Sequence, residues 1–159
     1  MAGASPEITI SKMPTTKVAI ITASWHPEVC DALVSGARRA CSRAEVAEVE
    51  ILTVAGSFEL PLAAQFAFEK GFDAVVVLGL VLRGETPHFD YVCQGVTSGV
   101  MDVQLKFSKP IGFGVLMCDS IEQARDRCGL SESKEDKGFD AAQAALSLFS
   151  LSRMQPLKR

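Results

Sequence analysis

The chain has 159 residues, of which 48% are hydrophobic and 22% charged, and its formal net charge is −3. This length fits one globular domain with a sizeable core and leaves little room for a second. The negative charge argues against a nucleic-acid-binding protein, and no apolar run is long enough to cross a bilayer. The polar segment 1–13 lacks the apolar region of a signal peptide, so we expect a cytoplasmic protein.

Short apolar runs alternate with amphipathic stretches along the chain. Residues 17–23 predict a buried strand, and Pro27 then opens a helix with apolar residues at about every fourth position. The same reasoning predicts strands at 46–54, 73–80 and 111–117, and helices at 59–70, 88–107, 119–127 and 138–153, with Asp119 as the N-cap of the third of these helices. Strict β-α alternation predicts a four-stranded parallel sheet between helix layers, a flavodoxin-like three-layer α/β/α sandwich.

The predicted domain covers residues 14–155, between a flexible segment at 1–13 and a short tail at 156–159. Residues 8–10 have the pattern of a short edge strand, which can be added from or to a neighbouring subunit. Gly95 and Gly99 stand four apart and leave a smooth ridge on the helix 88–107. We expect this ridge to allow close helix packing within the subunit rather than between subunits.

The cysteines are odd in number and include no C-x-x-C pair, so neither a zinc cluster nor a disulfide framework is predicted. We interpret all five as small buried thiols. A catalytic thiolate at Cys93 or Cys118, with His88 as its base, is the alternative.

Three of the predicted strands end in unusual groups of side chains. These groups are Ser24-Trp25-His26-Pro27, Gly56-Ser57-Phe58-Glu59 and the segment 83–88. Because the carboxyl ends of parallel strands meet at one edge of a sheet, we expect the three groups to converge on a binding site.

Each of these groups offers ligand contacts beside a plainer structural role. Trp25 either covers the edge of the core or stacks on a planar heterocycle, and Glu59 either caps a helix or binds ligand hydroxyls. His88 opens a helix, where the positive end of the dipole favours a neutral imidazole that can take up and pass on a proton. We expect Arg83 to order its loop or pair with a carboxylate, while backbone N–H groups of residues 84–86 suit a phosphate.

Two further basic residues, Arg127 and Lys137, stand at predicted helix ends, where a solvated charge is the default interpretation. They would have a binding role only if a ligand placed its phosphate group beside them. Neither a P-loop nor a G-x-G-x-x-G pattern is present, so nucleotide binding of those types is not predicted.

Five segments together resemble one known family. They are Ala55–Pro61 (AGSFELP), Leu78–Cys93 (LGLVLRGETPHFDYVC), Pro110–Leu116 (PIGFGVL), Ile121–Gly129 (IEQARDRCG) and Asp136–Gly138 (DKG). In this order, over about residues 17–150, they are similar to the lumazine synthase (6,7-dimethyl-8-ribityllumazine synthase) family of riboflavin biosynthesis, and the run R-G-E-T-P-H-F-D-Y is highly specific.

The resemblance implies a transferase that condenses 5-amino-6-(D-ribitylamino)uracil with (3S)-3,4-dihydroxy-2-butanone 4-phosphate. The reaction passes through an imine, loss of phosphate and ring closure, and it requires no cofactor and no metal. His88 is then the implied proton carrier, and Glu85, Thr86 and Arg127 the implied phosphate ligands.

The resemblance also assigns the other substrate. Trp25 takes the position of an aromatic residue that stacks on the pyrimidine, and Leu80, Val81 and Leu82 meet the ring through their backbone. The ribityl chain is held by Ser57, Phe58 and Glu59. The neighbouring subunit supplies Phe113, and completes the pocket together with Arg127 and Lys137.

The sequence departs from the commoner family pattern in three places, of which the first keeps the stacking surface and the others affect loop stiffness more than chemistry. Trp25 stands where Phe is frequent, Ala55 where Pro is frequent, and Met117-Cys118 where two threonines are frequent. The linker 131–137 is longer than in members that build sixty-subunit icosahedral capsids. A homopentamer is therefore favoured, with the capsid left open as the alternative.

Two other functions compete with the enzyme. The first is a non-catalytic flavin- or lumazine-binding or shell-forming protein on the same scaffold, which would not need the phosphate ligands Arg127 and Lys137. The second is a flavodoxin-like electron carrier, which would require a hydroxyl-rich phosphate loop where this chain has Ser24-Trp25-His26-Pro27.

Overall fold

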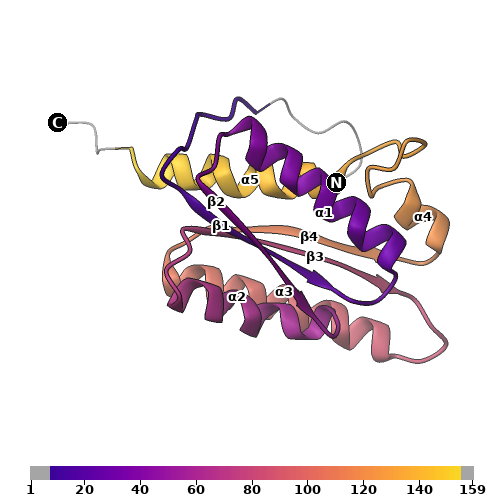
Figure 1. Cartoon of the computed structure of the whole chain (residues 1–159). Helices are drawn as coiled ribbons and strands as arrows, with labels where there is room; N and C mark the ends of the chain where they lie inside the picture. Colours follow the sequence, from indigo (N-terminus) through magenta and orange to yellow (C-terminus); the bar gives the residue numbers. More distant parts are fainter. Residues whose placement is uncertain (1–7, 155–159) are drawn as a thin grey trace.

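The computed structural model describes residues 8–154 and contains one parallel sheet. Its four strands are β1 (Lys17–Ala23), β2 (Glu48–Val54), β3 (Ala74–Leu82) and β4 (Ile111–Cys118). They lie side by side in the order β2-β1-β3-β4, and all three strand pairs are parallel. The carboxyl ends of the strands therefore share one edge (Figure 1).

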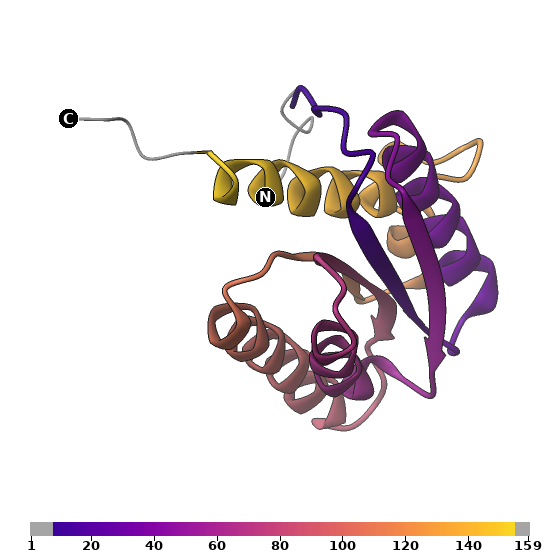
Figure 2. The same ribbon diagram turned by 60° about the vertical axis from the view of Figure 1, so that its left-hand side comes forward.

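Helices cover both faces of this sheet, as Figures 1 and 2 show. One face is covered by α1 (Pro27–Arg43) and α5 (Lys137–Ser152), with the short α4 (Ile121–Arg125) at its end. The other face carries α2 (Leu60–Glu69) and α3 (His88–Phe107). The three-layer flavodoxin-like sandwich predicted from the sequence is confirmed. No helix within residues 8–154 is long and apolar enough to span a membrane.

The central strands and the edge strands differ in burial. Nearly every side chain of β1 and β3 is buried, and the two faces of the sheet pack into two separate apolar clusters. On the edge strands, by contrast, apolar side chains stay partly exposed: Val49 and Ile51 on β2, and Phe113 and Met117 on β4. Exposed apolar residues on open edges are places where another chain can pack.

Several predicted boundaries shift in the structure. A 3-10 turn, η1 (Ser57–Glu59), precedes α2, and β3 runs to Leu82, two residues beyond its predicted end. The predicted N-cap Asp119 is wrong: Ser120 caps α4 by accepting a hydrogen bond from the Gln123 backbone N–H at 3.3 Å. The carboxylate of Asp119 is instead bound by an arginine of the neighbouring loop.

The glycine ridge of α3 packs inside the subunit, as expected. A Cβ added at Gly95 would lie 2.6 Å from the ring of Phe58, and one added at Gly99 would lie 2.9 Å from Pro61. Side chains at either position would push α3 away from η1 and α2. The ridge therefore lets the start of α2 approach α3 next to the candidate site.

Before β1, residues 8–10 form no strand within this chain. Met13 is buried, and its backbone N–H donates to the Ala44 carbonyl at 2.6 Å. Ile8 accepts a hydrogen bond from the Gln143 side chain at 2.5 Å. The rest of the predicted N-terminal segment, residues 1–7, and the predicted tail at 156–159 lie outside the described residues.

Candidate active site

A cavity of about 770 Å³ opens at the carboxyl edge of the sheet. Its lining combines residues of the three strand-end groups with the end of β3 and the first turn of α3. The convergence predicted from the sequence is therefore observed. The predicted site residues that line the cavity are Trp25, Ser57, Phe58, Glu59, Leu80, Val81, Leu82, Thr86 and His88.

The turn after β1 presents Trp25 with 67% of its surface exposed. The next residue, His26, has the left-handed backbone conformation (φ 56°), which is uncommon for a residue other than glycine. Its carbonyl accepts hydrogen bonds from the backbone N–H groups of Val29 and Cys30 in the first turn of α1, and the Cys30 thiol donates to the Trp25 carbonyl at 3.2 Å. These contacts fix the backbone that carries the exposed Trp25 ring.

The turn after β2 holds two oxygen-bearing side chains. Glu59 Oε2 accepts a hydrogen bond from the Gly56 N–H at 2.8 Å, so the carboxylate performs the capping role considered from the sequence. The Ser57 hydroxyl is buried and finds no hydrogen-bond partner within residues 8–154. An unpaired buried hydroxyl is costly, which makes Ser57 suited to a ligand hydroxyl. Gly79 leaves the space for it, since a Cβ there would lie 2.6 Å from Ser57 Oγ.

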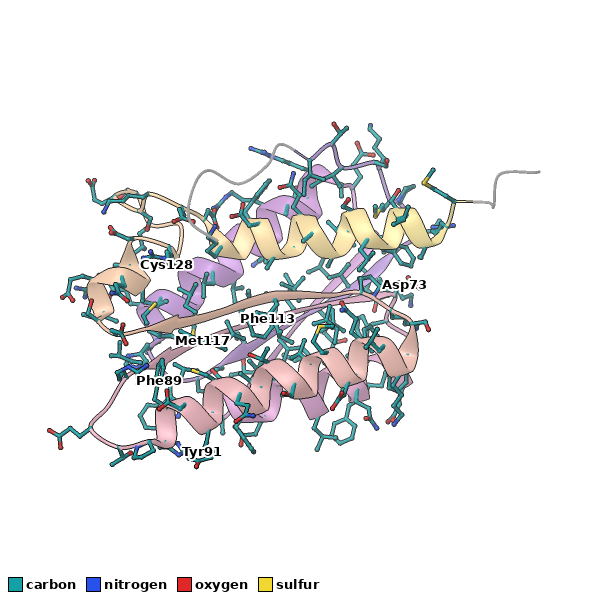
Figure 3. All side chains as sticks on the ribbon, turned by 180° about the vertical axis from the view of Figure 1, so that it is seen from behind. Asp73, Phe89, Tyr91, Phe113, Met117 and Cys128 are labelled. Carbon is teal, nitrogen blue, oxygen red and sulfur yellow. The ribbon has the colours of Figure 1, made fainter. Side chains whose placement is uncertain are left out.

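The third group follows β3 and leads into α3. Pro87 precedes the first helical residue, His88, as the sequence predicted. The His88 imidazole lines the cavity and makes no hydrogen bond or ion pair with any residue in 8–154. It is thus available to exchange a proton with a bound molecule. Figure 3 labels Phe89 and Tyr91 in the same first turn of α3.

Arg83 orders this loop, as expected. Its Nε donates to Asp119 Oδ1 at 2.6 Å and its Nη1 to Asp90 Oδ1 at 3.3 Å, while the guanidinium lies 4.0 Å from the ring centroid of Phe89. The two carboxylates raise the pKa of Arg83 above its ordinary value, the hydrogen bond to Asp119 contributing most.

Four predicted site residues do not line this cavity: Glu85, Phe113, Arg127 and Lys137. Phe113 is 40% exposed on the edge strand β4 (Figure 3). Arg127 lies two residues beyond α4, not at its end as predicted, and its Nη1 donates to the Gln123 carbonyl at 2.8 Å.

Lys137 begins α5, as predicted, but its ammonium is engaged within the chain. It forms ion pairs with Glu135 and, at 3.1 Å, with Asp140. The hydrogen bond to Glu135 and then that to Asp140 raise the pKa of Lys137 against the opposing effect of burial. Lys137 therefore carries its positive charge at neutral pH, already partly neutralised by two carboxylates.

Sequence reasoning missed several residues of the cavity wall. His26, Phe89, Tyr91 and Val92 also line it. The signal for the α3 residues was available, because positions one, three and four after His88 share its end of the helix. For His26, the only sequence signal was its position next to Trp25 in the same strand-end group.

The prediction of buried thiols is confirmed for four of the five cysteines and is wrong for Cys93, which is only partly buried. All five are free, and all but Cys93 are buried. Burial raises the pKa of both Cys93 and Cys118 above the ordinary thiol value, which disfavours the thiolate that nucleophilic catalysis needs. Within residues 8–154 no group of three or more His, Cys, Asp or Glu side chains is arranged to hold a metal.

Comparisons with known proteins give one answer. The family model described as 6,7-dimethyl-8-ribityllumazine synthase matches residues 15–153. Proteins of that name from Streptomyces coelicolor (49% identical; 90% of this chain and 89% of the relative) and Paenarthrobacter aurescens (56%; 82% and 81%) are similar to this chain. A third, from a Nocardioides species, is 53% identical over 82% of this chain and 81% of its own length. The chain belongs to the 6,7-dimethyl-8-ribityllumazine synthase family.

Proposed function

We propose that the protein catalyses the family's reaction at this cavity. It condenses 5-amino-6-(D-ribitylamino)uracil with (3S)-3,4-dihydroxy-2-butanone 4-phosphate and releases 6,7-dimethyl-8-ribityllumazine, phosphate and water. The observation that carries the proposal is the convergence of Trp25, Ser57 and His88, from three separate strand ends, on one cavity in a chain of this family.

The pyrimidine substrate fits the part of the cavity between the first two strand-end groups. The exposed face of Trp25 stacks on the flat ring, and backbone groups of residues 80–82 meet its polar edge. The ribityl chain lies against Phe58 and bonds to the Ser57 hydroxyl and the Glu59 carboxylate. Binding of a ribityl hydroxyl gives the buried Ser57 oxygen the partner that it lacks within the described chain.

The phosphorylated ketone binds toward the third group. Thr86, which lines the cavity, and the backbone N–H of Glu85, which lies just outside its lining, hold the phosphate together with an arginine, Arg127. Because Arg127, Phe113 and Lys137 do not line the cavity of their own chain, we propose that they complete the cavity of a neighbouring subunit. The enzyme is then a homo-oligomer, and we favour a pentamer over a sixty-subunit shell.

Catalysis in this arrangement comes largely from holding two reactive molecules together. The 5-amino group attacks the ketone carbonyl and water leaves to form an imine. Phosphate then leaves, and the ring closes with loss of a second water. Each of these steps moves protons, and the unpaired imidazole of His88 carries them. Positioning supplies the larger share of the rate, because a bimolecular reaction becomes effectively intramolecular in the cavity.

Mixing both substrates with the protein tests the proposal. The product's absorbance and fluorescence should grow with time, in proportion to the release of inorganic phosphate, and should not grow when either substrate is left out. Tight binding of the product with no turnover would contradict the proposal and would support a non-catalytic lumazine-binding protein instead.

A further inference from the structure

Arg83 joins three parts of the structure beside the cavity. Its backbone N–H donates to the Cys118 carbonyl at 2.9 Å, which extends the ladder between β3 and β4 by one bond. Its guanidinium binds Asp119 after β4 and Asp90 on α3, and stacks over Phe89. Arg83 therefore holds the start of the loop 84–87 to the end of β4, and the end of that loop to α3.

The contacts continue from Asp119 toward Arg127. The backbone N–H of Asp119 donates to Gln123 Oε1 at 2.9 Å, and the carbonyl of Gln123 accepts a hydrogen bond from Arg127 Nη1 at 2.8 Å. A continuous series of hydrogen bonds thus runs from Arg83, at the start of the loop that precedes His88, to the guanidinium of Arg127.

These contacts are better suited to fixing geometry than to holding the fold together. The side chains of Arg83, Asp90 and Asp119 are 45%, 65% and 65% exposed, and exposed ion pairs contribute little to stability. A guanidinium with several directional partners nevertheless has one orientation, and so do the segments that it joins.

We infer that Arg83 is a positioning residue that sets the loop 84–87 of one active site and, through Asp119 and Gln123, the Arg127 side chain. The inference rests on the proposed function, in which Thr86 and Arg127 bind the same class of phosphate group in adjacent sites. Each chain then uses Arg83 to orient the loop of its own site and the arginine that it lends to the next. Recognition of the phosphorylated ketone depends on this link, and recognition of the pyrimidine does not.

Steady-state kinetics on Arg83→Ala, with each substrate varied in turn, tests the inference. The KM for the phosphorylated ketone should rise about tenfold or more, because a misplacement of ~1 Å costs on the order of 100-fold. The KM for the pyrimidine should stay within about twofold of the wild-type value, since Trp25 and Ser57 do not touch Arg83. Light scattering and thermal unfolding should show an assembled, folded protein.

Arg125→Ala is the matched control. Arg125 lies on α4 and pairs with Glu28 at 2.9 Å, with side-chain exposure of 50% and 55%, but this pair does not contact the loop 84–87. Losing it should leave both KM values unchanged. If Arg83→Ala behaves like Arg125→Ala, or raises both KM values equally, Arg83 is not a positioning residue.

Two further variants distinguish the loss of the Arg83–Asp119 contact from a general loss of stability. Asp119→Ala should reproduce part of the loss caused by Arg83→Ala, and the double variant should lose no more than Arg83→Ala alone, because Arg83→Ala already removes the contact with Asp119. Arg83→Lys should restore part of the ketone KM, since it keeps the charge but not the forked geometry. Additive losses would overturn the inference. If Arg83→Ala fails to fold, Asp119→Ala and Arg83→Lys decide it alone, and an unchanged ketone KM in both would reject the inference.

Failure of the proposed function would look different. A wild-type protein that forms no product disproves the proposed reaction, whatever Arg83 does. Calorimetric titration with inorganic phosphate then still tests the link, because wild-type protein should bind phosphate more tightly than Arg83→Ala, and equal binding would reject the inference.

Discussion

The cavity and the β4 side of the molecule differ in how many of the predicted site residues one chain brings together there. Trp25, Ser57 and His88 are gathered around one cavity by a single chain. On the other side, Phe113 and Arg127 stand in two segments that resemble the family but line no part of that cavity. The difference shows that one chain gathers most of the proposed site residues around its cavity and leaves those on and after β4 outside it, which is why we propose that a second chain completes the site.

Removing Arg127 should produce the largest effect. Arg127→Ala deletes the charge that binds the phosphate, and loss of one partner of a charged pair typically costs about 2–5 kcal/mol, so kcat/KM for the ketone should fall at least about 30-fold. Pyrimidine binding, measured by fluorescence titration, should not change. The control is Arg38→Ala, which removes an arginine from the far side of α1. An Arg127→Ala enzyme with an unchanged ketone KM would place the phosphate elsewhere.

Removing His88 should slow turnover without abolishing it. General acid–base groups commonly contribute about 100-fold or more, but positioning is retained in His88→Ala, so we expect kcat to fall about 10- to 100-fold with substrate binding intact. Single-turnover measurements with both substrates bound would isolate the chemical step. A fully inactive variant that still binds both substrates would contradict the division of labour proposed for the cavity.

Mixing the two impaired variants tests whether His88 and Arg127 of one site come from different chains. When His88→Ala and Arg127→Ala subunits are unfolded, mixed equally and reassembled, about a quarter of the sites in a random oligomer combine an intact His88 with an intact neighbouring Arg127. Activity should rise toward that fraction of the wild-type value. Co-assembly without any recovery would show that both residues serve the same chain's site.

The smallest expected effect concerns Ser57. Ser57→Ala removes a buried hydroxyl that has no partner within the described chain, so the ligand-free protein should be equally or slightly more stable. The same change deletes a hydrogen bond to the ribityl chain, worth about 1 kcal/mol, and should raise the pyrimidine KM about fivefold. Thermal unfolding without product should show an unchanged or higher stability of the variant. Unfolding with product should show a smaller stabilisation by the product than in the wild type. A destabilised ligand-free variant would mean that the hydroxyl serves the fold.

Much of the fold could be predicted because its signals are local. Pro87 followed by an amphipathic stretch located the start of α3 at His88, and the apolar run of β3 identified a buried central strand. The start of α4 could not be located in this way. Aspartate commonly caps helices, but the carboxylate of Asp119 accepts a hydrogen bond from Arg83 instead. Arg83 lies 36 positions earlier in the sequence, so no local pattern predicts this pair.

The site was predictable to the extent that strand ends determine it. Parallel strands bring their carboxyl ends together, so the grouping of Trp25, Glu59 and His88 followed from the order of elements. The burial of the Ser57 hydroxyl could not be predicted from the sequence, because it depends on the space that Gly79 leaves on a different segment, the strand β3. Sequence reasoning also could not show that Lys137 is held by two carboxylates of its own chain.

The open edges of the sheet have a consequence for how the enzyme responds to its own abundance. Val49 and Ile51 on β2, and Phe113 and Met117 on β4, are partly exposed apolar side chains on these edges. Under the shared site that we propose, a solitary chain lacks a complete active site. The rate in a dilution series should therefore fall more steeply than the protein concentration, so a cell would gain little riboflavin precursor from the first copies that it synthesises.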